Sequence, residues 1–167
     1  RAAAAAAPAG TSIEIGSIRE IPLYDGDVEA EAGIPPAVQR LKDRIAAADG
    51  LLIATPEYNN SMPGVMKNAV DWLSRPPADI PRVFAGRPVA VIGASPGGFG
   101  TVMSQNAWLP VLRTLQTRFW SEGRLQVSRA PSVFTEEGEL ADAKTDEALR
   151  KFLAGFVEFA AARVGAG

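Results

Sequence analysis

The sequence contains no cysteine and no histidine among its 167 residues. Without cysteine, the chain forms no disulfide and has no thiolate nucleophile or cysteine-ligated metal. Without histidine, it lacks the commonest general base, the Ser–His catalytic triads and the usual zinc and iron ligands. We therefore expect no metal site, and any enzymatic chemistry must depend on carboxylates, lysine, tyrosine, backbone amides or a bound cofactor.

An excess of one charge and long apolar runs are also missing. Lys and Arg number 17 against 19 Asp and Glu, and this net charge of −2 favours neither nucleic acid nor an anionic membrane surface as a partner. No apolar run reaches the roughly 18 residues that suggest a membrane span. Hydrophobic residues make up 47% of the chain, and its length fits one domain over residues 1–167. The absence of cysteine is compatible with a reducing cytoplasm.

The chain begins with Arg1 and an alanine run that Pro8 ends. Alanine has the highest helix propensity, and Gly10 is typical of the residue that follows a helix. The basic start and bulky apolar core of a signal peptide are missing. We interpret residues 1–9 as the last turns of a helix whose beginning is missing, and we expect the domain to be N-terminally incomplete.

Strand and helix patterns alternate along the rest of the chain. The expected strands are 11–15 with an extension over 18–23, 51–54, 88–93, and 125–127 with a continuation over 132–134. The expected helices are 36–48, 64–73, 102–119 with a kink or restart at Pro110, and 145–163; the expected loops include 24–35, 75–88 and 135–143. Such alternation predicts a parallel sheet with helices on both faces, joined by right-handed crossovers.

Two loops follow apolar strands directly, so we expect both at the sheet edge where ligands bind in such folds. The first, residues 55–64 (TPEYNNSMPG), is either a strand-to-helix connection or a platform for a planar polar ring, with Tyr58 as an aromatic surface. The second, residues 94–100 (ASPGGFG), has three glycines in four positions. It is either a flexible turn or a wall that a ligand approaches closely. It matches neither the dinucleotide fingerprint nor the P-loop.

The run from Leu51 to Pro76 (LLIATPEYNNSMPGVMKNAVDWLSRP) resembles the signature of NAD(P)H-dependent FMN reductases. This flavodoxin-like family includes quinone, azo-dye and chromate reductases. Its pattern is a strand followed by Pro-Glu-Tyr-Asn-x-Ser-x-Pro-Gly-x-x-Lys-Asn-Ala-x-Asp-Trp, and every fixed position from Pro56 to Trp72 is met. Residues 21–24 and 84–100 resemble further segments of the family, so the resemblance covers about residues 1–164.

The resemblance implies a flavodoxin-like, doubly wound, parallel five-stranded sheet, here without its first strand and phosphate loop. It implies FMN as cofactor, NAD(P)H as co-substrate and a quinone-like small oxidant as acceptor. The residues expected around the flavin ring are Pro56, Glu57, Tyr58 and Asn59 from the first loop, and Ser95, Gly97 and Gly98 from the second. Because the flavin supplies the redox chemistry, we name no catalytic acid or base. The family also implies a cytoplasmic homodimer or homotetramer.

Four residues of the motif allow more than one role. Flavin contact and loop bracing are equally open for Lys67, Asn68 and Asp71, while Trp72 is expected in the core or at a subunit interface.

The family's phosphate loop, Gly-Ser-x-Arg-x-x-Ser-x-Asn, has no counterpart in this sequence. Residues 16–19 (GSIR) begin like it, but Ser and Asn do not follow at the required positions, and residues 20–25 have an extended pattern. We therefore expect the phosphate loop before Arg1. The alternative function is a non-enzymatic flavodoxin-like module, either an electron carrier or a scaffold with an empty flavin site. Electron carriers of this fold are usually strongly acidic, which this chain is not.

Overall fold

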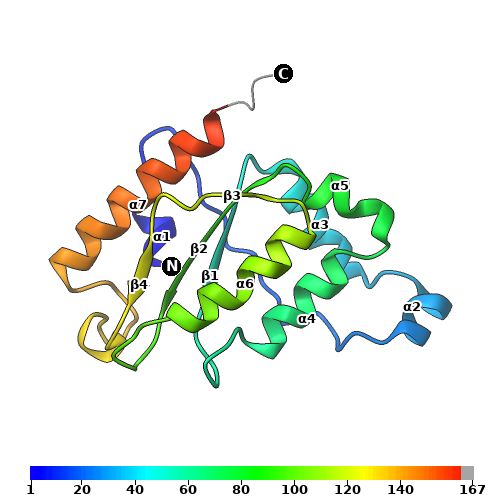
Figure 1. Ribbon diagram of the computed structural model, residues 1–167, viewed down its shortest axis with the longest axis horizontal. Coiled ribbons are helices and arrows are strands. Elements are labelled where there is room, and N and C mark those ends of the chain that lie inside the picture. Colours follow the sequence, from blue (N-terminus) through cyan, green and yellow to red (C-terminus); the bar gives the residue numbers. More distant parts are fainter. Residues whose placement is uncertain (163–167) are drawn as a thin grey trace.

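The computed structural model describes residues 1–162. Within them, the central sheet consists of four parallel strands: β1 (Leu51–Thr55), β2 (Pro88–Ala94), β3 (Arg118–Phe119) and β4 (Leu125–Val127). β1 pairs with one edge of β2, with Leu51 opposite Val89 and Thr55 opposite Gly93. β3 and β4 pair in turn with the other edge of β2 (Figure 1). β2 is therefore the central strand.

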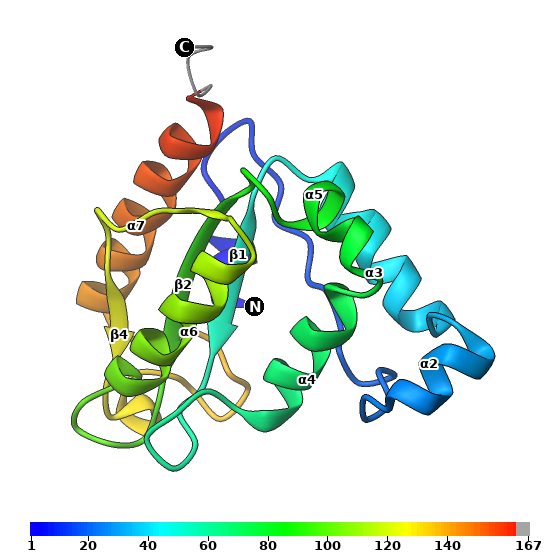
Figure 2. The same ribbon diagram turned by 45° about the vertical axis from the view of Figure 1, so that its right-hand side comes forward.

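Helices cover both faces of this sheet (Figures 1 and 2). One face carries α3 (Pro36–Ala47), α4 (Gly64–Leu73), α5 (Ile80–Val83) and α6 (Val102–Thr114). The other carries α1 (Ala2–Ala5) and α7 (Ala143–Ala161). Alternate residues of β2 enter the two cores, with Val89 and Val91 in the first and Ala90 and Ile92 in the second, which is the period of a strand buried on both sides. The predicted doubly wound parallel architecture is confirmed.

Most of the expected regular elements form where the sequence places them. β1, β2, β4, α3 and α4 agree with the prediction to within one residue at each end. Within the helical stretch expected over residues 1–9, only Ala2–Ala5 is helical (α1), and Gly10 lies beyond it with φ +76°. α7 begins two residues earlier than expected, and the predicted end of that helix at Arg163 lies outside the described residues.

The strand expected at 11–15, with its extension over 18–23, is wrong: both segments are irregular. An extended segment becomes a strand only by pairing, and β1 pairs with β2 alone among the described strands. Side chains hold the segment instead. Ile13 packs on the core of the α7 face, and Arg44 donates to the carbonyl of Ile15 (3.2 Å).

The expected continuation of the sheet over 132–134 is also wrong. Residues Ala130–Ser132 form a 3₁₀ turn, η2, and Phe134 makes only an isolated bridge with Leu140. Arg129 has φ +50°, and Pro131 has no N–H to donate to a ladder. Because of these two residues, the extended conformation of β4 does not continue beyond Arg129.

Two expected loops contain helices. Residues 24–35 include α2 (Gly26–Ala32), whose first turn is stabilised by Asp25, a side-chain acceptor for the N–H of Asp27 (2.9 Å). Asp27 and Glu29 also place negative charge in the first turn of α2, where it stabilises a helix. The acidic composition of the segment did not by itself predict this helix. Residues 75–88 include the 3₁₀ turn η1 (Pro77–Asp79) and α5.

α6 ends at Thr114, so the expected helix 102–119 is too long. Gln116 adopts φ +58°, which a right-handed helix cannot continue through. β3 then begins at Arg118, whose N–H donates to the carbonyl of Arg87 (2.8 Å). Of the kink or restart expected at Pro110, the restart does not occur, because α6 runs through that residue.

Candidate functional site

The loops after β1 and β2 leave the sheet side by side. Thr55 ends β1 opposite Gly93, one residue before the end of β2. A Cβ at Gly93 would lie 2.3 Å from both the Thr55 carbonyl oxygen and Thr101 Oγ1, so only glycine permits this approach. The two loops expected to share an edge are therefore brought together at the carboxyl ends of the strands, where parallel sheets bind ligands.

The first loop projects a tight turn. Tyr58 and Ser61 exchange backbone hydrogen bonds of 3.1 and 3.0 Å, and the two residues between them, Asn59 and Asn60, have φ of 50° and 58°. Positive φ at both central positions is the pattern of a type I′ turn, and asparagine tolerates it well. Tyr58 is 57% exposed, so its ring is presented at the surface.

The side chain of Glu57 contacts the start of α6. Its Oε2 accepts hydrogen bonds from the backbone N–H groups of Met103 (2.9 Å) and Ser104 (3.0 Å), at the start of α6. Beside it, Thr55 Oγ1 and Ser104 Oγ share a buried hydrogen bond of 3.0 Å. The carboxylate of the motif thus connects the first loop to the helix that follows the second loop.

Ser95 is buried and braces the glycine loop. Its hydroxyl donates to the carbonyl of Gly100, and its N–H donates to the carbonyl of Val127 (3.0 Å). The N–H of Arg129 donates to the carbonyl of Gly97 (3.0 Å), which attaches the tip of the loop to the segment after β4. The loop is therefore ordered by its neighbours.

Gly97 and Gly98 differ from Gly93 and Gly100. Neither has positive φ, and a Cβ would meet only Ser95 Oγ at 3.8 Å at Gly97 and nothing within 4 Å at Gly98. Within the described residues, neither conformation nor packing requires glycine at these positions. Both are exposed, and the space above them is open to a ligand.

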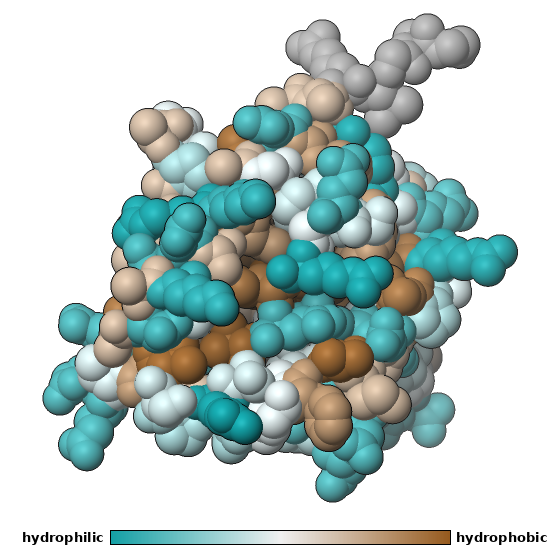
Figure 3. Space-filling model, turned by 60° about the vertical axis from the view of Figure 1, so that its left-hand side comes forward, coloured by the Kyte–Doolittle hydropathy of each residue, from teal (hydrophilic) through white to brown (hydrophobic). Residues whose placement is uncertain are grey.

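A cavity of about 400 Å³ opens beside the two loops. Its walls come from the carboxyl ends of β1, β2 and β4, from α1 and α7, and from the loop before α7, with Thr55, Pro56 and Ala94 among them. Ala54, within β1, is exposed to this cavity. Apolar surface shows between hydrophilic side chains on the α7 side of the molecule (Figure 3).

The helix of the motif, α4, braces a loop. Asn68 Oδ1 accepts from the N–H of Tyr24, and its Nδ2 donates to the carbonyl of Pro22, both at 2.8 Å. Trp72 Nε1 donates to the same carbonyl (3.0 Å), and its side chain is fully buried, which confirms the expected core position. Lys67 and Asp71 pair with each other along the helix at 2.7 Å.

Residues 16–19 do not form a phosphate loop. In a phosphate loop a strand leads into a helix N-terminus, whereas these residues lie in the irregular segment that runs to Asp25. Within the described part of the chain, no helix is long and apolar enough to cross a membrane. Nor do three or more carboxylates gather there in an arrangement that could hold a metal ion.

Comparisons with known proteins show the family of this chain. A model of the NADPH-dependent FMN reductase family matches residues 1–132. An NAD(P)H-dependent FMN reductase of Pseudomonas aeruginosa is 46% identical over 146 residues, which cover 87% of this chain and 77% of that protein. A quinone reductase of Escherichia coli is 39% identical over 155 residues, 92% of this chain and 81% of that protein.

Solved structures include the flavoenzyme FerB, an NAD(P)H:(acceptor) oxidoreductase from Paracoccus denitrificans. It superposes with a TM-score of 0.83 at 34% identity, over 95% of this chain and 85% of FerB. The chain belongs to the NADPH-dependent FMN reductase family. Its cofactor is FMN and its co-substrate is NAD(P)H. The exposed turn and the open space over Gly97 and Gly98 suit a flat ring.

Proposed function

We propose that this chain passes electrons from NAD(P)H through FMN to a quinone-like small molecule. FMN held by these loops would supply the hydride-transfer chemistry between NAD(P)H and the acceptor. The observation that carries the proposal is the pair of loops that meet at the carboxyl edge of the sheet. The quinone reductase of Escherichia coli and a 2-hydroxy-1,4-benzoquinone reductase of a Burkholderia species (37% identical over 152 residues) support this acceptor class.

The proposed ring contacts are Pro56, Glu57, Tyr58 and Asn59 on one side, and Ser95, Gly97 and Gly98 on the other. The backbone N–H groups of Glu57 and Asn59 donate to no other residue of the described chain, so they are free to face the polar edge of the ring. Gly97 and Gly98 let the second loop approach it. Ser95 contributes by ordering this loop, because its hydroxyl is bonded within it.

We further propose that the protein is a cytoplasmic homodimer or homotetramer. Apolar side chains are exposed on the two helices that flank the loops: Val65 on α4, and Met103 and Leu109 on α6. Burying them against a second copy would remove apolar surface from water next to the site.

The test uses the purified full-length protein, incubated with FMN and then freed of unbound flavin. We expect a yellow protein that oxidises NAD(P)H when a quinone is added. A protein that stays colourless would overturn the proposal and leave the scaffold reading. A yellow protein that cannot be reduced by NADH or NADPH would favour the electron-carrier reading.

A further inference from the structure

We propose that Glu57 is a positioning residue that sets the spacing of the two loops by closing the N-terminus of α6. The expected effect of Glu57 on flavin binding rests on the proposed function. The contacts of Glu57 with α6 involve only residues of this chain.

The contacts of Glu57 are those of a helix cap supplied from elsewhere in the sequence. The first N–H groups of a helix have no partner within it, and they attract negative charge. Thr101, the residue that precedes α6, makes no side-chain capping bond. Glu57, 46 residues before Met103, supplies the acceptor instead and satisfies two of these N–H groups with one oxygen.

This capping is the link between the projecting turn and the rest of the site. The hydrogen bonds of Tyr58 and Ser61 stay within the turn and do not hold it in place. Thr55, at the base of the loop, is tied to Ser104 and packed against Gly93. Glu57 lies between that base and the turn, so its carboxylate fixes where the turn points.

The helix end that Glu57 holds is also the end of the glycine loop. Thr101 follows Gly100 directly and accepts a hydrogen bond from Gln105 Nε2 (3.0 Å). The same Nε2 donates to the carbonyl of Leu125 in β4 (2.9 Å). A displacement of the start of α6 would therefore change the width of the space between the two loops.

The test compares three variants. Glu57→Ala removes the acceptor, and Glu57→Gln keeps an oxygen but removes the charge. Asp25→Ala is the matched control, because Asp25 accepts from the N–H of Asp27 at the start of α2, at the far end of the molecule from the loops (Figure 1). Two quantities are measured: amide hydrogen exchange of the protein without FMN, and the FMN dissociation constant from quenching of flavin fluorescence.

Without FMN, Glu57→Ala should speed exchange at Met103 and Ser104 by about fivefold or more, since a lost cap costs roughly 1 kcal/mol, with Glu57→Gln between it and the wild type. The FMN dissociation constant should rise by about tenfold in Glu57→Ala and change by less than about twofold in Asp25→Ala. If Glu57→Ala does not fold, amide hydrogen exchange and the FMN dissociation constant are both measured on Glu57→Gln.

Different results would contradict the positioning role of Glu57 and the proposed FMN-dependent function. Unchanged exchange at Met103 and Ser104 in both Glu57 variants would overturn the positioning role, whatever the flavin does. Equal flavin affinity in Glu57→Ala and Asp25→Ala would also overturn it. A wild-type protein that binds no FMN would overturn the proposed function, while the exchange measurement would still decide whether Glu57 holds α6.

Discussion

At the scale of single residues, Asn68 takes the place of a neighbouring strand. Its amide offers one acceptor and one donor to the backbone of Pro22–Tyr24, as a paired strand would. The segment from residue 11 to 25 joins no sheet, so these bonds are central to its position. Loop bracing is therefore the role that the structure shows for Asn68.

We predict that Asn68→Asp lowers the free energy of unfolding by about 1–2 kcal/mol, because it sets a carboxylate oxygen against the carbonyl of Pro22. Asn106→Asp is the same chemical change at an exposed position of α6 without a side-chain hydrogen bond in the described structure, and should stay within about 0.5 kcal/mol of the wild type. Urea denaturation measures both. Equal losses would show that the Asn68 bonds contribute no stability.

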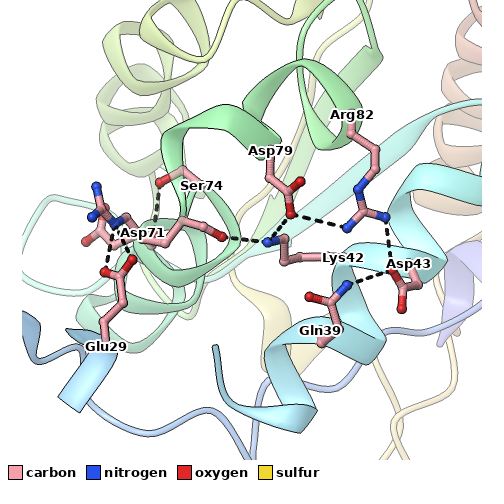
Figure 4. A network of polar contacts seen from close by, with 9 residues as sticks. Glu29, Gln39, Lys42, Asp43, Asp71, Ser74, Asp79 and Arg82 are labelled. Atoms are coloured by element: carbon pink, nitrogen blue, oxygen red, sulfur yellow. Dashed lines mark hydrogen bonds and ion pairs between the residues drawn. The ribbon is translucent and has the colours of Figure 1, made fainter. Parts of the chain in front are cut away.

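Lys42 is a fully buried cation with its charge satisfied. It pairs with Asp79 and donates to the carbonyl of Arg75, while Arg82 joins Asp79 (3.4 Å) to Asp43 (2.9 Å) (Figure 4). The hydrogen bond from Lys42, followed by that from Arg82, lowers the pKa of Asp79. Arg82 and Gln39 lower the pKa of Asp43 in the same way.

A carboxyl group with a lowered pKa in the folded state stabilises the protein above its unfolded pKa of about 3.9, and this stabilisation is lost as the pH falls through the folded value. We predict that the free energy of unfolding decreases less steeply below about pH 4 in Asp79→Asn than in the wild type. The variant is also less stable at neutral pH, because Lys42 loses its carboxylate partner.

The control for this pH dependence is Glu31→Gln, an exposed carboxylate of α2 without an ion pair among residues 1–162. Urea titrations at a series of pH values should give it the wild-type slope. A wild-type slope in Asp79→Asn as well would contradict a role for the Lys42–Asp79 pair in acid sensitivity.

At the scale of elements, the junction of β1, β2 and α6 is the tightest part of the site. Thr55, Gly93 and Thr101 meet there, and a side chain at Gly93 has no room. The spacing of the two loops therefore depends on backbone contact as well as on the Glu57 cap. The same contact explains why position 93, just before the predicted glycine loop, must be glycine.

We predict that Gly93→Ala destabilises the fold by about 1–3 kcal/mol and weakens FMN binding, because the backbone oxygen of Thr55 must move away. Gly64→Ala is the control, since an added Cβ at this first residue of α4 meets nothing within 4 Å. It should be neutral or stabilise by up to about 1 kcal/mol. Denaturation midpoints that fall equally in both variants would speak against a special constraint at Gly93.

At the scale of the whole molecule, α4 and α6 present an exposed apolar face. A lysine in place of Leu109 would put a charge on that face, so we predict that Leu109→Lys lowers the mass measured by light scattering toward that of one chain. Ile15→Lys, at an exposed apolar position outside these helices, should leave the mass unchanged. A wild-type protein that is monomeric over the whole concentration range would refute the proposed homo-oligomer.

The sequence alone determined the family, the doubly wound class, and the positions of β1, β2, β4, α3 and α4. These features depend on apolar runs, helical periodicity and a long local motif, and each of these patterns lies within a short stretch of consecutive residues. The sequence also placed both loops at one edge, because parallel strands share their carboxyl ends.

Only the tertiary structure showed the hydrogen-bond partners of Glu57, Ser95 and Asn68, since each partner lies outside the residue's own segment or depends on how its loop closes. It also decided that 11–15 is not a strand and that residues 26–32 form α2. A strand needs a partner beside it and a short helix needs its cap and ion pairs, and neither can be read from local propensity. Folding brought the Glu57 carboxylate to α6, and no local pattern encodes that contact.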